Sequence, residues 1–354
     1  MIRKVHLQNV AGIAEFANQE SFPGVTVILG KNDVCKTSLL KMLYVLEKSS
    51  ELYSRKAVHE SGISASGVTA EKMRGVYGRN KVDLGDIVRK NGSIKRLYAH
   101  AEFEDSPWES VDFSFGSDSK GQIKDFHCNL ADLNDAHNVI FIPSKEVITA
   151  FAAIKAVVRQ YFFPGYDDTT LDLIDMLDMP EVNETRIENR EILETIASMF
   201  SGELKRVQNS DNFVFKKGYS EFSLQMTAEG VKHIGVIANL IRNGLIHKGT
   251  VLMLDEPEDN LHPFAIRQLV KVLMALGKAG VQIFMTTHNY FAIKQLQIES
   301  RKEGAAGVMC CSMTRGDDGN IRSSFSDLKD VMPENDIVSE SLAMYDEEIE
   351  SQME

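Results

Sequence analysis

The sequence predicts an α/β fold, with a mixed sheet flanked by helices, an antiparallel β part and a helical subdomain. Three apolar runs carry this prediction, because each ends in a polar group. VTVIL precedes a turn of small and polar residues, VLML precedes two acids, and VQIFM precedes two threonines and a histidine. Such runs are typical of strands buried on both faces of a parallel sheet. We therefore expect their polar ends to meet at one sheet edge.

The N-terminal half divides into strands, one helix and an insertion. Residues 1–30 predict antiparallel strands with a break at Ala11-Gly12, and a helix with one apolar face follows Lys36. The stretch from residue 50 to residue 95 is rich in Gly and Ser and weakly periodic. This pattern predicts a mobile or β insertion over residues 50–100. Alternation from 95 to 115 predicts a hairpin that turns near 105–107. VIFIP, at 139–143, predicts another buried strand.

The C-terminal half is predicted to be mainly helical. Residues 148–205 form the helical subdomain, with breaks at Pro164-Gly165 and Met179-Pro180, and a strand pair follows around Lys217-Gly218. Helices are expected at 227–246 and 263–279. The chain after the third apolar run is expected to be irregular until Ile337. One main domain, 1–330, is thus followed by an acidic tail, 331–354.

Composition narrows the class of protein. Apolar content of 43% and charged content of 25% are ordinary for a globular chain, and no apolar run is long enough to span a membrane. Four cysteines without a CxxC pair suggest neither zinc nor disulfides, so we expect a cytoplasmic protein. The net charge is −12, and eight acids without any Lys or Arg lie between Glu334 and Glu354. Residues 74–96 are locally basic. A solvated loop is favoured over a DNA contact there, because charged segments usually just face water.

The first polar turn resembles a phosphate-binding loop. GKNDVCKT at 30–37 fits G-x-x-x-x-G-K-[ST] except that Cys35 replaces the second glycine. Backbone N–H groups at a helix N-terminus, a lysine and a hydroxyl for Mg²⁺ are what a nucleotide requires. The expected nucleotide contacts are Gly30, Lys31, Asn32, Asp33, Val34, Cys35, Lys36, Thr37 and Ser38.

Cys35 adds a Cβ where glycine allows close approach of the backbone. It also places a thiol beside the phosphates, near a helix N-terminus that lowers a thiol pKa. A tolerated substitution is favoured over a redox switch.

The other two runs supply a metal ligand, a base and a phosphate contact. Asp255 is expected to hold Mg²⁺ together with Thr37, and Glu256 to polarise water. His288 is expected to contact the terminal phosphate. Each residue also has an ordinary interpretation, because acids often follow a buried strand into solvent and a histidine often ends one. The combination with the phosphate loop predicts a nucleoside triphosphatase.

These motifs, with TAEGVKHIGVIANLI and TTHNYF, resemble those of ABC-type P-loop ATPase heads of the SMC, RecF and OLD kind. The closest resemblance is to stand-alone bacterial AAA ATPases of the OLD-like branch, found in antiphage defence systems such as Septu and PARIS. The resemblance implies ATP and Mg²⁺ as cofactors. It also implies that Lys36 and Thr37 are Walker A, Asp255 the Walker B ligand, Glu256 the catalytic base and His288 the switch histidine.

The sequence departs from this family in the segment that would face the ATP of a second subunit. MTAEGVK, at 226–232, stands where an LSGGQ-like signature is usual. Thr227 can cap a helix and Gly230 can permit close approach, but Glu229 is unfavourable near a phosphate unless it points away.

The long coiled-coil arms of SMC proteins and a Toprim-like nuclease are not evident in the sequence. The resemblance therefore implies a homo-oligomer, a head-to-head dimer or larger, that works with a separate effector such as a nuclease or toxin. A nucleotide-gated scaffold with little turnover is the alternative. A transporter ATPase subunit is disfavoured by the missing LSGGQ and the DEPEDNLHP form.

Overall fold

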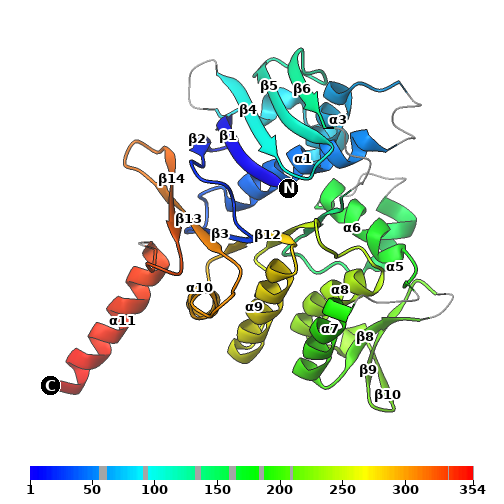
Figure 1. Ribbon diagram of the computed structural model, residues 1–354, viewed down its shortest axis with the longest axis vertical. Helices are drawn as coiled ribbons and strands as arrows, with labels where there is room; N and C mark the ends of the chain where they lie inside the picture. Colours follow the sequence, from blue (N-terminus) through cyan, green and yellow to red (C-terminus); the bar gives the residue numbers. More distant parts are fainter. Residues whose placement is uncertain are drawn as a thin grey trace.

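The computed structural model describes residues 1–55, 62–90, 95–131, 137–158, 165–182, 187–207, 210–333 and 335–353. Its strands form an eleven-stranded sheet in the order β6-β5-β4-β1-β2-β14-β13-β3-β12-β11-β7, and a small sheet in the order β10-β9-β8 (Figure 1). The strands are β1 (Ile2–Val10), β2 (Ile13–Ala17), β3 (Val25–Leu29), β4 (Arg96–Phe103), β5 (Trp108–Gly116), β6 (Asp125–Leu130), β7 (Val139–Ile142), β8 (Glu203–Arg206), β9 (Phe213–Lys217), β10 (Ser220–Ser223), β11 (Val251–Asp255), β12 (Gln282–Thr287), β13 (Val308–Arg315) and β14 (Ile321–Asp327).

The helices are α1 (Lys36–Ser54), α3 (Ala65–Gly78), α4 (Leu84–Ile87), α5 (Phe151–Ala153), α6 (Asp168–Asp178), α7 (Ile187–Phe200), α8 (Glu229–Arg242), α9 (Pro263–Lys278), α10 (Tyr290–Ser300) and α11 (Asp336–Met353). Short 3₁₀ turns occur at η1 (Arg79–Lys81) and η3 (Leu224–Met226), and a π-helical turn, η2 (Ile154–Val158), follows α5.

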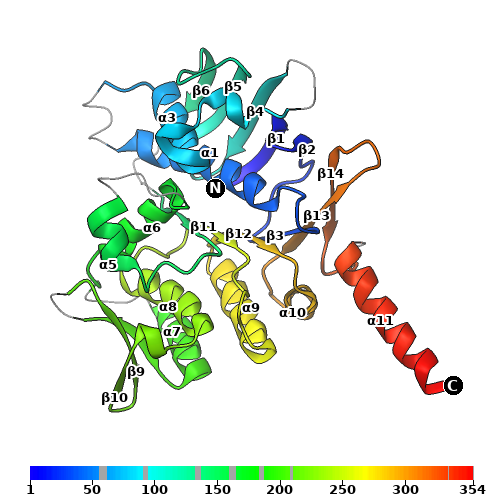
Figure 2. The ribbon, with the colours of Figure 1, turned by 180° about the vertical axis from the view of Figure 1, so that it is seen from behind.

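The parallel half of the sheet positions the site. β13, β3, β12, β11 and β7 run parallel, and β12 pairs with both β3 and β11. Every residue of β3, β11 and β12 is buried, since α1 covers one face of this half and α9 the other (Figure 2). Parallel strands end at the same edge. The residues after β3, β11 and β12 are therefore neighbours, as the three apolar runs predicted.

The hairpin near 105–107, the strand at 139–143, the strand pair around Lys217-Gly218 and the helices at 227–246 and 263–279 are confirmed, the last two as the shorter α8 and α9. The mainly helical segment from 148 to 200 is confirmed in its described part. Its predicted break at Pro164 lies outside the described residues. β6 and β8 were not expected.

The expectation for residues 50–100 is wrong in part, because the described portion before β4 is mainly helical. α1 continues to Ser54, and α3 packs along α1. Glycines and serines weaken the 3.6-residue pattern in α3, but Ser64 caps its N-terminus by accepting a hydrogen bond from Gly67 N–H at 3.1 Å. Residues 56–61 and 91–94 lie outside the described part.

The expectation of an irregular chain before Ile337 is also wrong. α10, β13 and β14 occupy this region, and β13 pairs with β3 next to the phosphate loop. Its run VMCCSM mixes sulfur-containing and polar residues, so it lacks the aliphatic character of the other parallel strands. The acidic tail that follows contains a long helix, α11. No described helix is long and apolar enough to cross a membrane.

Candidate active site

The phosphate loop joins β3 to α1 and contains left-handed backbone at three residues. Gly30 has φ +154°, and a Cβ there would lie 2.6 Å from Met313 O, so no larger residue fits. Asp33 has φ 70°, and Cys35, the N-cap of α1, has φ 61° and ψ 29°. The left-handed conformation at Cys35 explains why the motif prefers glycine at this point.

The Cys35 thiol lies beside the turn between β1 and β2. A Cβ built on Gly12, in the turn between β1 and β2, would lie 2.7 Å from Cys35 Sγ. The side chain therefore packs against this turn and the adjoining apolar cluster, where it is partly buried. The strand pair at the N-terminus thus accommodates the Cβ that the altered motif adds.

Lys36 is held inside its own loop. Its side chain is 6% exposed, and Nζ donates hydrogen bonds to Gly30 O at 2.8 Å and Lys31 O at 3.0 Å. The same nitrogen lies 3.8 Å from Glu256 Oε1. A buried ammonium is stable only with such acceptors. Phosphate oxygens are stronger acceptors for it than loop carbonyls.

Asp255 and Thr37 meet across the sheet edge, as predicted. Thr37 Oγ1 donates to the Asp255 carboxylate, 2.9 and 3.1 Å from its two oxygens, and Thr286 Oγ1 donates to Oδ1 at 2.8 Å. Burial raises the pKa of Asp255, the two hydroxyls lower it, and nearby Glu256 raises it again. A carboxylate beside a hydroxyl is a hard oxygen donor set, which fits Mg²⁺.

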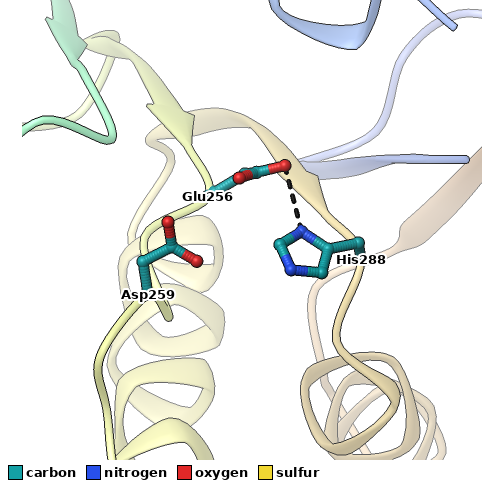
Figure 3. A group of neighbouring side chains, drawn as sticks. All are labelled: Glu256, Asp259 and His288. Atoms are coloured by element: carbon teal, nitrogen blue, oxygen red, sulfur yellow. Dashed lines mark hydrogen bonds and ion pairs between the residues drawn. The ribbon is translucent and has the colours of Figure 1, made fainter. Parts of the chain in front are cut away.

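Glu256, which follows Asp255 in the chain, forms a pair with His288 (Figure 3). His288 Nδ1 lies 3.0 Å from Glu256 Oε1. Glu256 has φ 47°, and its N–H donates to Thr286 Oγ1 at 2.9 Å, so β12 holds the strained residue that carries the predicted base. Asp259 joins them, with ligand atoms of the three residues within 4.8 Å of one another. Burial, then the Glu256 charge, raises the pKa of Asp259.

Glu258 is a buried acid at this site that sequence reasoning missed. It is 3% exposed and accepts a hydrogen bond from the Thr287 hydroxyl. Thr287 Oγ1 in turn accepts the Asn289 N–H at 3.0 Å, and Asn289 caps α10. Burial raises the pKa of Glu258 to about 7. The sequence showed only a charged residue in a turn, which normally faces solvent.

The signature-like segment has a different local role from the predicted one. Thr227 donates to Ser223 O at 2.9 Å and does not cap α8, whose N-cap is Ala228. Glu229 forms an ion pair with Lys232 at 2.9 Å. A Cβ on Gly230 would lie 2.1 Å from Leu261 Cδ2, so this glycine lets α8 pack against the turn after β11.

Two contacts join the phosphate loop to the C-terminal elements. Arg315, the last residue of β13, lies 3.1 Å from the Asp33 carboxylate, and Lys31 lies 3.2 Å from that of Asp336, the first residue of α11. Sequence reasoning missed both, because the partners lie about three hundred residues apart.

Solved structures with the same fold include heads of SMC proteins. The SMC head bound to the C-terminal winged-helix domain of ScpA aligns over 93% of this chain and 98% of its own, with 14% identity and a TM-score of 0.55. The Pyrococcus furiosus SMC head with an extended coiled coil, bound to the C-terminal domain of ScpA, aligns over 93% and 97%, with 11% identity and a TM-score of 0.52. The fold is therefore that of an ABC-type P-loop ATPase head. A comparison with curated proteins finds no match.

The family model for the AAA domain described as "putative AbiEii toxin, Type IV TA system" matches residues 25–294. The match begins at β3 and extends past His288, so it contains all three motifs. It covers well over half of the chain. This protein is a member of that AAA family, and its fold is that of the SMC heads.

Proposed function

We propose that this protein binds and hydrolyses ATP as a subunit of a bacterial antiphage defence or genome-maintenance complex, in which it assembles with itself and with a separate effector. The observation that carries the proposal is the convergence of Lys36, the Thr37–Asp255 contact and the Glu256–His288 pair at one sheet edge. ATP and Mg²⁺ are what members of such ATPase families generally use. The defence role rests on the resemblance to OLD-like proteins, and the nuclease or toxin is its expected partner.

Each side chain of the site has a separate role in phosphoryl transfer to water. Lys36 would exchange its loop carbonyls for the terminal phosphates, and Thr37 and Asp255 would hold a Mg²⁺, which would supply positive charge to the phosphate oxygens. Glu256 orients the attacking water and accepts its proton. His288 holds the Glu256 carboxylate through Nδ1, and its exposed ring is available to the terminal phosphoryl. In the proposed dimer, Thr227, Glu229 and Gly230 would face the nucleotide of the second subunit.

A nucleotide-gated scaffold with little turnover is the second candidate. The left-handed, non-glycine Cys35 favours it, since strain in the phosphate loop opposes tight closure. Phosphate release by the purified protein, with and without double-stranded DNA, separates the two. Turnover that depends on Mg²⁺ and Glu256 supports the enzyme. A tightly binding protein with negligible turnover supports the scaffold.

Glu256→Gln should bind ATP normally and accumulate the ATP-bound form, because only the base is lost. Turnover should fall at least tenfold, or about 1.4 kcal/mol in barrier. Lys36→Ala should lose nucleotide binding, and Lys217→Ala is the control, because Lys217 is exposed at the end of β9, outside the phosphate loop. Retained micromolar ATP affinity in Lys36→Ala would show that the loop is not the phosphate site.

A further inference from the structure

α11 is attached to the body only through its first turns, within the described residues. Asn335 is buried and caps the helix by accepting the Val338 N–H at 3.0 Å. Val338 is 8% exposed, and Ile337 packs against the main apolar cluster. Asp336 pairs with Lys31 of the phosphate loop. The base of α11 therefore has a defined position beside the nucleotide site.

The rest of α11 projects away from the body (Figures 1 and 2). Its side chains from Leu342 onward are exposed as far as they are described. Four large apolar residues are among them: Leu342 at 54%, Met344 at 71%, Tyr345 at 57% and Ile349 at 53%. An isolated helix as short as this projecting part, residues 342–353, is marginally stable in water, and leaving such side chains exposed forgoes their burial energy.

Three of these exposed apolar residues, all except Met344, follow a 3-4 spacing. From buried Val338, the steps to Leu342, Tyr345 and Ile349 are four, three and four residues. At 3.6 residues per turn these side chains fall within a stripe about 60° wide. This is the narrow seam that one helix presents to another helix, not the broad face of a core helix. We call Leu342, Tyr345 and Ile349 the α11 seam.

The charges beside the seam have one sign. α11 contains six acids and no Lys or Arg. Asp346 and Glu348 lie on opposite sides of the stripe, each about 80° from its middle, where the flanking residues of a coiled-coil partner would be. A second copy of α11 would place acid against acid at these positions, which is destabilising. The same charge opposes an anionic membrane or a nucleic acid.

We propose that α11 is a docking helix for a different protein, which covers the seam with an apolar helix or groove bordered by Lys and Arg. The charge complementarity selects this partner, because only basic borders pair with Asp346 and Glu348. The identification of that partner with the separate effector rests on the proposed function, whereas docking at the seam does not. A partner bound here lies next to Lys31 and the phosphate loop.

The probe is a labelled synthetic helical peptide of about three heptads, with Leu and Ile at the core positions and Lys at the flanking ones. Fluorescence anisotropy measures its binding to the full chain. Leu342→Gln/Ile349→Gln removes the seam without changing the charge, and Met344→Gln is the matched control. Met344 is 71% exposed and lies about 120° from the seam on the same helix. Circular dichroism checks that all forms keep their helix content.

The seam variant should weaken peptide binding at least about tenfold, whereas Met344→Gln should stay within about twofold. A peptide with Glu in place of Lys should not bind. Equal effects of the two variants, or no effect of either, overturn the proposal. So does concentration-dependent self-association in sedimentation that the seam variant abolishes, since the second copy is then the occupant. The binding assay needs no ATP turnover, so failure of the proposed ATPase activity is detected separately, by phosphate release.

Discussion

Cys35 shows how a deviation from a motif is accommodated by its neighbours. A non-glycine residue in left-handed backbone costs about 1 kcal/mol, and this residue keeps that conformation at the start of α1. Its thiol fills the space beside Gly12 that the β1–β2 turn leaves open. The strain lies in the loop that must close on a phosphate.

Cys35→Gly should therefore bind ATP at least as tightly as the parent, because glycine removes the strain. Stability should change by no more than about 1 kcal/mol, since glycine also raises the entropy of the unfolded chain. A titration of both forms under reducing conditions measures this, with Cys128→Ser as the control outside the loop. Substantially weaker binding by the glycine form would show that the loop is adapted to cysteine. Unchanged parent affinity after mild oxidation would remove a redox switch at this position.

Glu258 makes the stability of the protein depend on pH. Its pKa is raised from 4.5 to about 7 by burial, so the folded state keeps a proton that the unfolded state releases. Protonated Glu258 therefore contributes its full stabilisation of the folded state below about pH 4.5. This stabilisation is lost as the pH rises through about 7.

Glu258→Gln should reduce this dependence, because an amide stays neutral and can still accept the Thr287 hydroxyl. The free energy of unfolding of the parent, relative to the variant, should fall by about 3 kcal/mol between pH 4.5 and 7.5. Urea unfolding across this range measures it. Parallel curves for the two proteins would show that Glu258 is already ionised at low pH. Asp317→Asn, on an exposed turn, is the control.

At the scale of elements, β12 joins the parts of the site through two successive threonines. Thr286 contacts Asp255 and the Glu256 N–H, while Thr287 contacts Glu258 and the Asn289 N–H. Side chains of successive strand residues point to opposite faces. The end of β12 therefore holds the turn after β11 from both sides of the sheet.

α8 supports the same turn through Gly230, which predicts a specific effect of a methyl group. Gly230→Ala should destabilise the protein by about 1–3 kcal/mol, because the new Cβ would overlap Leu261. Thermal or urea unfolding measures this. Gly67→Ala in α3 is the matched helical control: its Cβ meets the exposed Ile63 side chain at 3.1 Å, and alanine favours the helix. If both variants are neutral, α8 and the turn are not in close contact.

At the scale of the whole molecule, the proposed assembly predicts ATP-dependent self-association. ATP with Mg²⁺ should raise the sedimenting mass of Glu256→Gln, where bound ATP persists, and ADP should not. Lys36→Ala should stay in its nucleotide-free state at the same protein concentration. A mass that is independent of nucleotide in all forms would contradict ATP clamped between subunits, and would favour a complex held together by other surfaces.

The sequence by itself determined the site-bearing half of the fold. Uninterrupted apolar runs occur where strands are buried on both faces, and parallel strands of this kind end at one edge. The sequence alone could therefore group the residues that follow these strands, which are Lys36, Asp255, Glu256 and His288. Local periodicity likewise predicted α1, α8 and α9 and the β4–β5 hairpin, because short-range patterns specify these elements.

Only the tertiary structure decided what depends on contacts between distant segments. β13 is a central strand because β3 pairs with it, and its mixed sequence carries no such signal. Glu258 is buried because Thr287 and the surrounding turn enclose it, and the Cys35 thiol has a place because Gly12 leaves one. The α11 seam is exposed because the helix projects away from the body. Burial and exposure are properties of the packed chain, and a residue's own type predicts them only on average.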